Sequence, residues 1–285
     1  MTSSSPPTIP TIAVLGSLNV DLVTRTPRVP AAGETIIANG FSTGHGGKGA
    51  NQAVACARLS RTRTRPSSTP PDVFVRMIGA VGDDHFGAEF LRALKDDGLD
   101  VEGVRVVAGE RTGTAVIVVE EESGENRIMV VINPAPAVPL SDEVYQGLGH
   151  LIVNESEAAL LSGRPAEEIT PDADLTAVAA DFVRRGVRNV IITLGSAGCF
   201  YHTSALHAEG LPGKIVPARK VKVVDTTAAG DTFAGAYAVA VAKSRAQGPF
   251  DIDAAIAFAN RAAAQTVQRK GAQSAIPWLD EVPEA

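Results

Sequence analysis

Apolar positions along this chain follow two alternating patterns, short continuous runs and longer stretches with helical spacing. The short runs predict buried strands at Thr11–Leu15, Val73–Val81 and Val190–Thr193. The helical spacing predicts helices over Gln52–Leu59, Asp84–Leu94, Leu175–Arg185, Phe233–Ala242 and Asp251–Val267. Strands and helices that alternate in this way favour an α/β layer fold with a largely parallel sheet. A chain of 285 residues fits one or two domains, and α/β folds of this size often form one.

Several regions depart from the alternation. Glu34–Gly40 and Thr114–Val131 have the pattern of exposed strands, and the second contains a hairpin turn at Glu122–Glu125. Arg61–Pro71 is a basic surface loop rich in Pro, Ser and Thr. Residues 1–10 are Ser-, Pro- and Thr-rich without an apolar core, so we expect a disordered tail rather than a signal peptide, followed by one domain over residues 11–285.

Charge and composition narrow the function classes. A net charge of −6 argues against nucleic-acid binding as the main activity. Cys56 and Cys199 are the two cysteines, which indicates a reducing compartment. No run approaches the roughly 18 apolar residues that a membrane span needs. The five histidines are scattered and predict no zinc site. We therefore expect a cytoplasmic protein, present also in the nucleus if the source is a eukaryote, with no membrane or nucleic-acid partner.

The segment Asp225–Gly235 carries the clearest chemical signal. It follows the β-type run Lys222–Val224 and leads into an apolar helix pattern. A small-residue turn at the start of a helix leaves backbone N–H groups without intrahelical partners, which suits an anion such as a phosphate. A carboxylate here, Asp231, suits proton abstraction from a hydroxyl that attacks the phosphate. The alternative is that Asp231 caps the helix.

A second glycine-rich segment lies upstream at Gly44–Gln52. Its glycines allow the backbone to approach a ligand closely, and Lys48 and Asn51 supply hydrogen-bond donors. It is not a Walker A loop, because Gly49 rather than Ser or Thr follows the lysine. A plain turn before a helix is the alternative for this segment alone.

Taken in order, these and further motifs resemble the ribokinase-like, or phosphofructokinase-B, family of carbohydrate kinases. The resemblance runs from Ile12 to Trp278 and rests on Gly16–Asp21, Pro30–Thr35, Gly46–Gln52, Gly79–Gly87, Asn133–Ala137, Asn154–Glu157, Thr193–Gly198, Asp225–Phe233 and Lys270–Gln273. It implies a three-layer α/β/α fold with a small β-sheet lid over the sugar, built from about residues 24–43 and 112–131.

One departure from the family pattern falls at Val131–Ile132. In the family the lid hairpin is followed by a turn, a helix, a core strand that carries a sugar-contacting acid, and another helix. Here Ile128–Val131 runs straight into Ile132–Pro134, so a piece of about 30 or more residues is absent. Loss of a core strand should open the sheet. A catalytically impaired variant is therefore one alternative for this chain.

The resemblance assigns roles to residues of the catalytic and sugar sites. Asp231 is the general base, and the helix start formed by Ala228, Ala229 and Gly230 stabilises charge on the transferred phosphoryl group. Sugar hydroxyls are bound by Asn19, Asp21, Gly47, Lys48, Asn51 and Asp231. For Asn19 and Asp21, a simple turn after the first strand is the alternative.

Nucleotide and magnesium roles follow in the same way. The resemblance places ATP against Asn154, Thr193, Gly195, Gly198, Gly230 and Asn260. Glu157 arranges Mg²⁺ through water, an indirect role that suits a strongly hydrated cation. The alternative for Asn154 and Glu157 is a capping box at a helix start, and for the two glycines after Thr193 a strand-end turn.

The family also implies an activating monovalent cation, usually K⁺. The matching positions are Asp225, Thr227, Thr266, Arg269, Gly271 and Ala275, most of them acting through backbone carbonyls. Ala275 stands where a serine is common, with Ser274 one place away. For Lys270–Gln273 a helix C-terminus with a glycine stop is the alternative.

The activity that the resemblance implies is ATP-dependent phosphorylation of a sugar on an alcohol group, with D-ribose converted to D-ribose 5-phosphate. Another sugar or a nucleoside is the alternative acceptor. The implied partners are ATP and the small sugar, and the implied assembly is a homodimer formed through the lid.

Overall fold

The structure is a computed structural model that describes residues 9–26, 37–64, 71–118, 131–132, 140–247 and 250–284. Several predicted features lie outside these ranges: residues 1–8 of the predicted tail, the hairpin turn at Glu122–Glu125, and the motif segments Pro30–Thr35 and Asn133–Ala137. In the described ranges, no helix combines the length and the apolar character that a membrane crossing requires.

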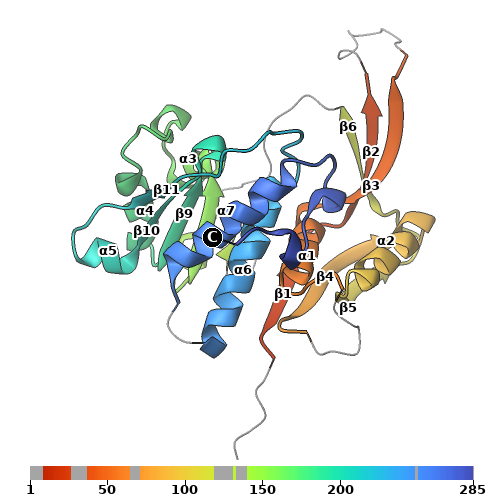
Figure 1. The fold of residues 1–285 in the computed structure, drawn as a ribbon, viewed down its shortest axis with the longest axis horizontal. Helices are drawn as coiled ribbons and strands as arrows, with labels where there is room; N and C mark the ends of the chain where they lie inside the picture. The colour runs from red at the N-terminus through yellow and green to blue at the C-terminus, as the bar shows by residue number, and fades with distance from the viewer. Residues whose placement is uncertain are drawn as a thin grey trace, which may run out of the picture.

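Strands form three sheets, shown in Figure 1. The first has the order β1-β4-β5 and is parallel, with β1 at Thr11–Leu15, β4 at Phe74–Gly82 and β5 at Asp100–Val107. The second sheet has the order β11-β10-β9-β8-β7. Its strands are β7 (Val131–Ile132), β8 (His150–Asn154), β9 (Asn189–Thr193), β10 (Cys199–Thr203) and β11 (Lys214–Val216). In it β7, β8 and β9 run parallel, and β10 pairs antiparallel with both its neighbours.

The third sheet is small and has the order β3-β2-β6. Its strands are β2 (Asn19–Arg25), β3 (Gly40–Gly46) and β6 (Gly113–Val118). Strand β3 is antiparallel to β2, whereas β6 is parallel to it. Figure 1 shows that β2 and β3 extend away from the rest of the molecule. Such a sheet agrees with the predicted lid, although β2 begins at Asn19, earlier than the predicted position 24.

Helices cover the two larger sheets. They are α1 (Lys48–Leu59), α2 (His85–Asp96), α3 (Glu155–Ser162), α4 (Leu175–Arg184), α5 (Ser204–Ala208), α6 (Ala229–Gln247) and α7 (Ile252–Thr266). Short 3-10 turns lie at η1 (Asp142–Val144), η2 (Ala166–Glu168), η3 (Gly195–Ala197), η4 (Gln273–Ala275) and η5 (Leu279–Glu281). Side chains of Asp84, Asp174 and Asp251 cap α2, α4 and α7, which is why these helices begin where they do. The predicted α/β class is confirmed.

Three local predictions were wrong. Residues 37–39 are not extended into a strand, because β3 begins only at Gly40. Lys222–Val224 forms no strand either; Val224 instead donates its N–H to the Val267 carbonyl at 2.7 Å, beyond the end of α7. Helix α1 begins at Lys48 rather than Gln52, so Lys48 and Asn51 belong to its first turn and not to a loop.

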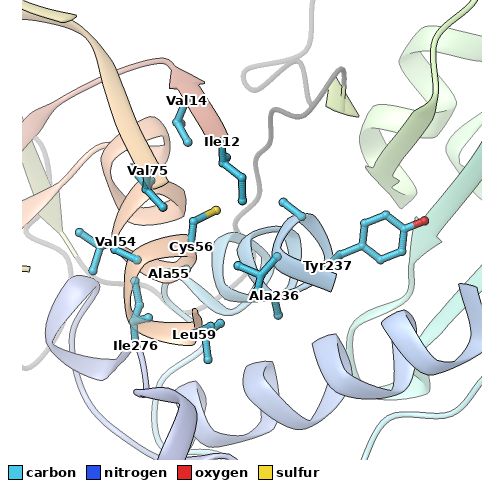
Figure 2. Close-up of a cluster of buried hydrophobic side chains, with 14 of the residues drawn as sticks. Ile12, Val14, Val54, Ala55, Cys56, Leu59, Val75, Ala236, Tyr237 and Ile276 are labelled. Atoms are coloured by element: carbon cyan, nitrogen blue, oxygen red, sulfur yellow. The ribbon is translucent and has the colours of Figure 1, made fainter. Parts of the chain in front are cut away.

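One hydrophobic core joins both large sheets. Helices α1 and α6 pack against each other at its centre, with Cys56 and Leu59 facing Ala236, and Ile12 and Val75 closing it from the first sheet (Figure 2). The same core includes Ile152 of β8, Ile191 of β9 and Tyr201 of β10, so it continues beneath the second sheet. The two sheets are therefore held to a common layer of helices.

The crossing of α1 and α6 is close because Gly235 has no side chain. A Cβ atom there would lie 2.5 Å from the Ala55 Cβ and 3.2 Å from the Gln52 carbonyl oxygen. The Cys56 thiol lies 3.7 Å from the Gly235 carbonyl oxygen. This contact brings the first turns of the two helices face to face.

The opposite face is covered unevenly. On the other face of the second sheet, a separate core from β8, β9, α3 and α4 gathers Val153, Val190 and Phe182. On β1 the alternate residues Thr11, Ala13 and Leu15 are exposed, Leu15 to 61%. Within the described ranges β1 pairs on one edge only, with β4. The three-layer arrangement is thus complete around β8 and β9 but has two layers around β1.

Candidate active site

The site is centred on the start of α6. Asp231 occupies the third position of this helix and is 2% exposed. The N–H groups of Gly230 and Asp231 belong to the first helical turn, where no intrahelical acceptor exists, whereas the Ala229 N–H donates to the Thr226 carbonyl at 3.2 Å. With the helix dipole, the remaining donors suit a negatively charged group.

The turn that delivers Asp231 is strained. Ala228 has a φ of 60°, and no other described residue except glycine has a positive φ. This conformation costs an alanine about 1–2 kcal/mol. The Ala228 carbonyl is fixed by two donors of Thr232, its N–H at 2.9 Å and its hydroxyl at 2.8 Å. Strain held in this way is a feature of functional turns.

Two amide side chains of α1 hold the Asp231 carboxylate. Asn51 Nδ2 donates to Oδ2 and Gln52 Nε2 donates to Oδ1, each at 3.0 Å. All three side chains are at most 5% exposed. Burial raises the pKa of Asp231 to about 7, opposed by the Asn51 hydrogen bond and the Lys48 charge and assisted by the Glu157 charge. The carboxylate is therefore basic enough to accept a proton near neutral pH.

This geometry does not match a simple helix cap. A capping carboxylate lies just before the helix and accepts from backbone N–H groups of the first turn. Asp231 lies inside α6, and its carboxylate accepts hydrogen bonds from Asn51 and Gln52 of α1.

The glycine-rich segment ends β3 and begins α1. Gly47 has a φ of 87°, and a Cβ there would lie 2.7 Å from both the Asn19 nitrogen and the Ser17 oxygen. Gly49 packs equally closely on the backbone of Gly16. Because both positions exclude a side chain, the turn lies directly against the backbone that follows β1. The charge of Lys48 acts to lower the pKa of Asp231.

Asn19 and Asp21 lie opposite this segment. Asn19 pairs with Gly46, and Asp21 with Gly44, in the antiparallel register of β2 and β3. A Cβ on Gly46 would meet the Asp21 carboxylate. Burial raises the pKa of Asp21 to about 6. Both residues therefore belong to strand β2 rather than to the turn that was the alternative.

Asn154 and Glu157 form the capping box that was one of the two interpretations. Asn154 Oδ1 accepts the Glu157 N–H at 2.8 Å, and Glu157 Oε2 accepts the Asn154 N–H at 3.2 Å. Glu157 is 5% exposed, and its charge acts on Asp231. The capping box thus fixes Glu157 in the first turn of α3.

Three of the residues predicted to bind ATP, Asn154, Thr193 and Gly195, lie at or just after the carboxyl ends of β8 and β9. Asn154 is the register partner of Thr193. Gly195 and Gly198 bound η3 with φ of 50° and 102°, and a Cβ on Gly198 would meet the backbone of Val216 and Ala218. Asn260 of α7 donates to the Pro217 carbonyl at 3.3 Å, so it lies beside the segment that Gly198 approaches. Ligands of open α/β sheets bind at this edge.

Hydrogen bonds link three of the residues predicted to hold a monovalent cation. Asp225 accepts the Thr227 N–H at 2.9 Å and the Gly271 N–H at 2.8 Å. Although burial acts to raise the pKa of Asp225, these amides and the Thr227 hydroxyl hold it below the ordinary value. Thr266 donates to Thr232 at 2.9 Å and so belongs to the same region.

The remaining two predicted cation positions differ from this group. The Arg269 side chain pairs with Glu281 at 3.2 Å, and Ala275 is a fully buried residue of η4. Their backbone carbonyls are the atoms that the prediction concerns.

The described residues contain no group of three or more His, Cys, Asp or Glu side chains arranged for a metal ion. A divalent cation that enters with a nucleotide would need at most one or two protein carboxylates, since Mg²⁺ retains water and phosphate ligands.

The structure thus joins Asn51 of α1 to Asp231 of α6, and the charges of Lys48 and Glu157 act on the same carboxylate. Sequence reasoning missed Gln52, which follows Asn51 in the same turn and faces the other oxygen of Asp231. The signal was available: a glutamine at a position otherwise occupied by the small apolar residues of a buried helix face.

Comparison with known proteins agrees with these features. The model of the pfkB family carbohydrate kinases matches residues 10–143 and again residues 127–279. A ribokinase of Schizosaccharomyces pombe is 41% identical over 325 aligned positions, which take in 95% of this chain and 96% of that protein. A ribokinase of Bacillus subtilis is 33% identical and covers 96% of this chain and 98% of its own length.

Solved structures give the same result. A ribokinase from Giardia lamblia superposes with a TM-score of 0.79 at 27% identity, covering 96% of this chain and 98% of that one. A ribokinase from Arabidopsis thaliana complexed with ribose and ATP superposes with a TM-score of 0.75 at 26% identity, covering the same shares.

Proposed function

This chain belongs to the pfkB family of carbohydrate kinases, and on that premise we propose that it transfers the γ-phosphoryl group of ATP to the primary hydroxyl of D-ribose, giving D-ribose 5-phosphate and ADP. Relatives named ribokinase that align over nearly the whole chain support ribose as the acceptor. The Arabidopsis structure with ribose and ATP supports both substrates. Another sugar or a nucleoside is the second candidate acceptor.

The observation that carries the proposal is the buried Asp231 at the start of α6. A carboxylate with a pKa near 7 sits beside helix N–H groups that attract phosphate. In the proposed reaction Oδ2 of Asp231 takes the proton of the sugar hydroxyl. The hydroxyl oxygen bonds to the γ-phosphorus as its bond to the leaving oxygen of ADP breaks. The first turn of α6 offsets the charge on the transferred group.

The sugar in this proposal lies between β2, β3 and α1. Asn19 and Asp21 would bind hydroxyls from one side, and Gly47, Lys48 and Asn51 from the other. Their close approach around Gly46 and Gly47 supports this placement. The nucleotide would lie at the carboxyl ends of β8 and β9, against Asn154, Thr193, Gly195, Gly198 and Asn260, with its phosphates directed at Gly230.

Two cations complete the proposal. A divalent ion such as Mg²⁺ would neutralise the triphosphate, and Glu157 at the start of α3 would hold its water ligands. A monovalent ion such as K⁺ would lie behind the α6 turn, held by Asp225 and Thr227 together with backbone groups of Thr266, Arg269, Gly271 and Ala275. The hydrogen bonds of Asp225 to Thr227 and Gly271 support one shared position.

We further propose that this chain lacks a core segment at Val131–Ile132 and is catalytically impaired for that reason. The family model matches in two pieces, residues 10–143 and 127–279, which overlap around this position. The alignment to the Schizosaccharomyces pombe protein is longer than the 285 residues of this chain, so that protein has positions without a counterpart here. The single pairing of β1 and the exposure of Leu15 support a strand and helices that once lay beside them.

Assembly and location belong to the same proposal. A homodimer through the small sheet would cover Ile37 and Phe41, whose exposed fractions are 88% and 65%. Sedimentation velocity of the chain and of Phe41→Ser tests it, with a monomer for both as the contradicting result. A cytoplasmic location would fit the two unpaired cysteines, Cys56 and Cys199.

The experiment that tests the function measures ADP release from ATP with a panel of hydroxyl acceptors. D-ribose should give the highest kcat/KM among pentoses, hexoses and nucleosides, and mass spectrometry should show a 5-phosphate. The chain and a version with the relative's segment inserted at Val131–Ile132 are run side by side. Higher turnover on another acceptor in both proteins would overturn ribose as the substrate.

A further inference from the structure

Gln52 differs from its neighbours in what it contacts. Its Nε2 donates to Asp231 Oδ1 at 3.0 Å. Its side-chain oxygen, Oε1, has no hydrogen-bond partner among the described residues. The residue is 2% exposed. A buried amide with an unsatisfied oxygen costs free energy, so a glutamine here needs a compensating role.

The packing of α1 on α6 determines where this amide lies. Gln52 and Cys56 are one turn apart on α1, as are Asp231 and Gly235 on α6. The Cys56 thiol contacts the Gly235 carbonyl, and the Gln52 side chain contacts Asp231. The close approach at Gly235 therefore fixes the backbone of Gln52, and the amide reaches Oδ1 from a rigid helix.

Asn51 bonds the other oxygen of the Asp231 carboxylate and also belongs to the proposed sugar site. Its Nδ2 donates to Oδ2, and its Oδ1 has no partner among the described residues. Asn51 stands in the proposed sugar site, so a sugar hydroxyl that reaches Oδ2 competes with it for the same acceptor. Gln52 donates to Oδ1 instead and is not among the residues of the proposed sugar site.

From this division we propose that Gln52 is a positioning residue, which fixes Oδ1 of Asp231 so that Oδ2 is the oxygen that takes the proton from the acceptor hydroxyl. The inference rests on the proposed function for its catalytic part. When the hydroxyl binds, it donates to Oδ2 in place of Asn51, whose amide then turns to the sugar. Gln52 keeps its bond throughout and prevents rotation of the carboxylate.

The test compares Gln52→Met with Cys56→Ala. Methionine keeps the length and volume of the side chain but removes the donor. Cys56→Ala alters the same helix contact one turn away and does not touch Asp231. Loss of orientation at a reacting group costs up to about 100-fold. We expect Gln52→Met to lower kcat 10- to 100-fold and to change the sugar KM by less than three-fold. Cys56→Ala should lower the melting temperature as much as Gln52→Met does but leave kcat unchanged.

A second readout does not depend on turnover. The ¹³C signal of the Asp231 carboxyl, assigned by its absence in Asp231→Asn, is followed against pH in protein with labelled aspartate. Charged groups that face it are Lys48 at the start of α1 and Glu157 at the start of α3, both kept constant between variants. Removing a donor to the carboxylate should raise its pKa in Gln52→Met but not in Cys56→Ala.

The two readouts separate the possible failures. An unchanged Asp231 titration together with unchanged kcat in Gln52→Met would overturn the positioning role. A raised pKa in a chain that phosphorylates no acceptor, even after insertion of the relative's segment, would retain the contact and overturn the proposed kinase function instead.

Discussion

Asp225 and Gly271 are 46 positions apart, yet the Gly271 N–H donates to the Asp225 carboxylate at 2.8 Å. The bond ties the turn that precedes α6 to the loop that follows α7. Because the other carboxylate oxygen accepts the Thr227 N–H, the side chain is fixed from both directions. Anything bound behind this turn therefore acts on the first residues of α6.

The first prediction concerns the monovalent cation. Potassium should raise turnover above that measured with a bulky organic cation at equal ionic strength, because an ion at Asp225, Thr227 and Gly271 would order the turn without contacting substrate. Asp225→Asn should weaken the response. Asp83→Asn is the matched control, since Asp83 accepts the N–H of Gly109 at 3.0 Å on the surface. Equal rates in both salts would rule out the site.

The second prediction concerns the helix crossing. Gly235→Ala should destabilise the protein by about 1–3 kcal/mol, because the added Cβ would overlap Ala55 and force α1 and α6 apart. Gly40→Ala is the control, as no atom lies within 4 Å of a Cβ there. Urea unfolding of both variants measures the difference. Equal stabilities would show that the crossing can relax.

The third prediction concerns the segment missing at Val131–Ile132. Inserting the corresponding piece of the Schizosaccharomyces pombe relative should raise the midpoint of thermal unfolding and lower the sugar KM, because β1 gains a second neighbour and Leu15 is covered. A flexible Gly/Ser insert of equal length is the control and should do neither. Cooperative unfolding and efficient ribose turnover by the 285-residue chain itself would contradict the proposed impairment.

The alternation of apolar runs predicted the α/β class, the strands β1, β4 and β9, and the five helices α1, α2, α4, α6 and α7, but not β5, β8, β10, β11, α3 or α5. Short apolar runs such as Val190–Thr193 permit little else when helical stretches flank them. The strand predicted at Lys222–Val224 was wrong. Its valines suggest a strand, but the Val224 N–H donates to the Val267 carbonyl after α7, and Val223 is 55% exposed. Propensity is a weak guide where no neighbouring strand is available.

The site was predictable in part for the same kind of reason. Glycines before a helix and a carboxylate in its first turn are local signals, so Asp231 and the segment around Lys48 were identified from sequence. Gln52 was not, because its partner is 179 residues away and its role depends on how closely α1 crosses α6. Likewise, no local pattern shows that Glu157 acts on Asp231.

The fourth prediction follows from the raised pKa of Asp231. Its value of about 7 lies above the ordinary 3.8, so between these limits the folded protein binds more protons than the unfolded chain. This stabilisation is complete below pH 4 and is lost as the pH rises to 7. Asp231→Asn removes the penalty, and the new amide can donate to the side-chain oxygen of Gln52, which has no hydrogen-bond partner among the described residues.

We therefore expect Asp231→Asn to be more stable than the parent at pH 8, with a smaller difference at pH 5. Denaturant unfolding at the two values measures this. Asp21, whose pKa is about 6, contributes in the same direction in both proteins and cancels in the comparison. A variant less stable than the parent at pH 8 would mean that the buried carboxylate contributes favourable bonds that outweigh its desolvation.

The most direct test of the account is the turnover of Asp231→Asn on the acceptor that gives the highest rate, measured in the version of the chain with the inserted segment. A general base contributes roughly 10²–10⁴-fold, so kcat should fall by that factor while ATP affinity changes little. The parent should also lose activity below about pH 7, as the carboxylate becomes protonated. Turnover of Asp231→Asn within a few-fold of the parent would contradict the catalytic role.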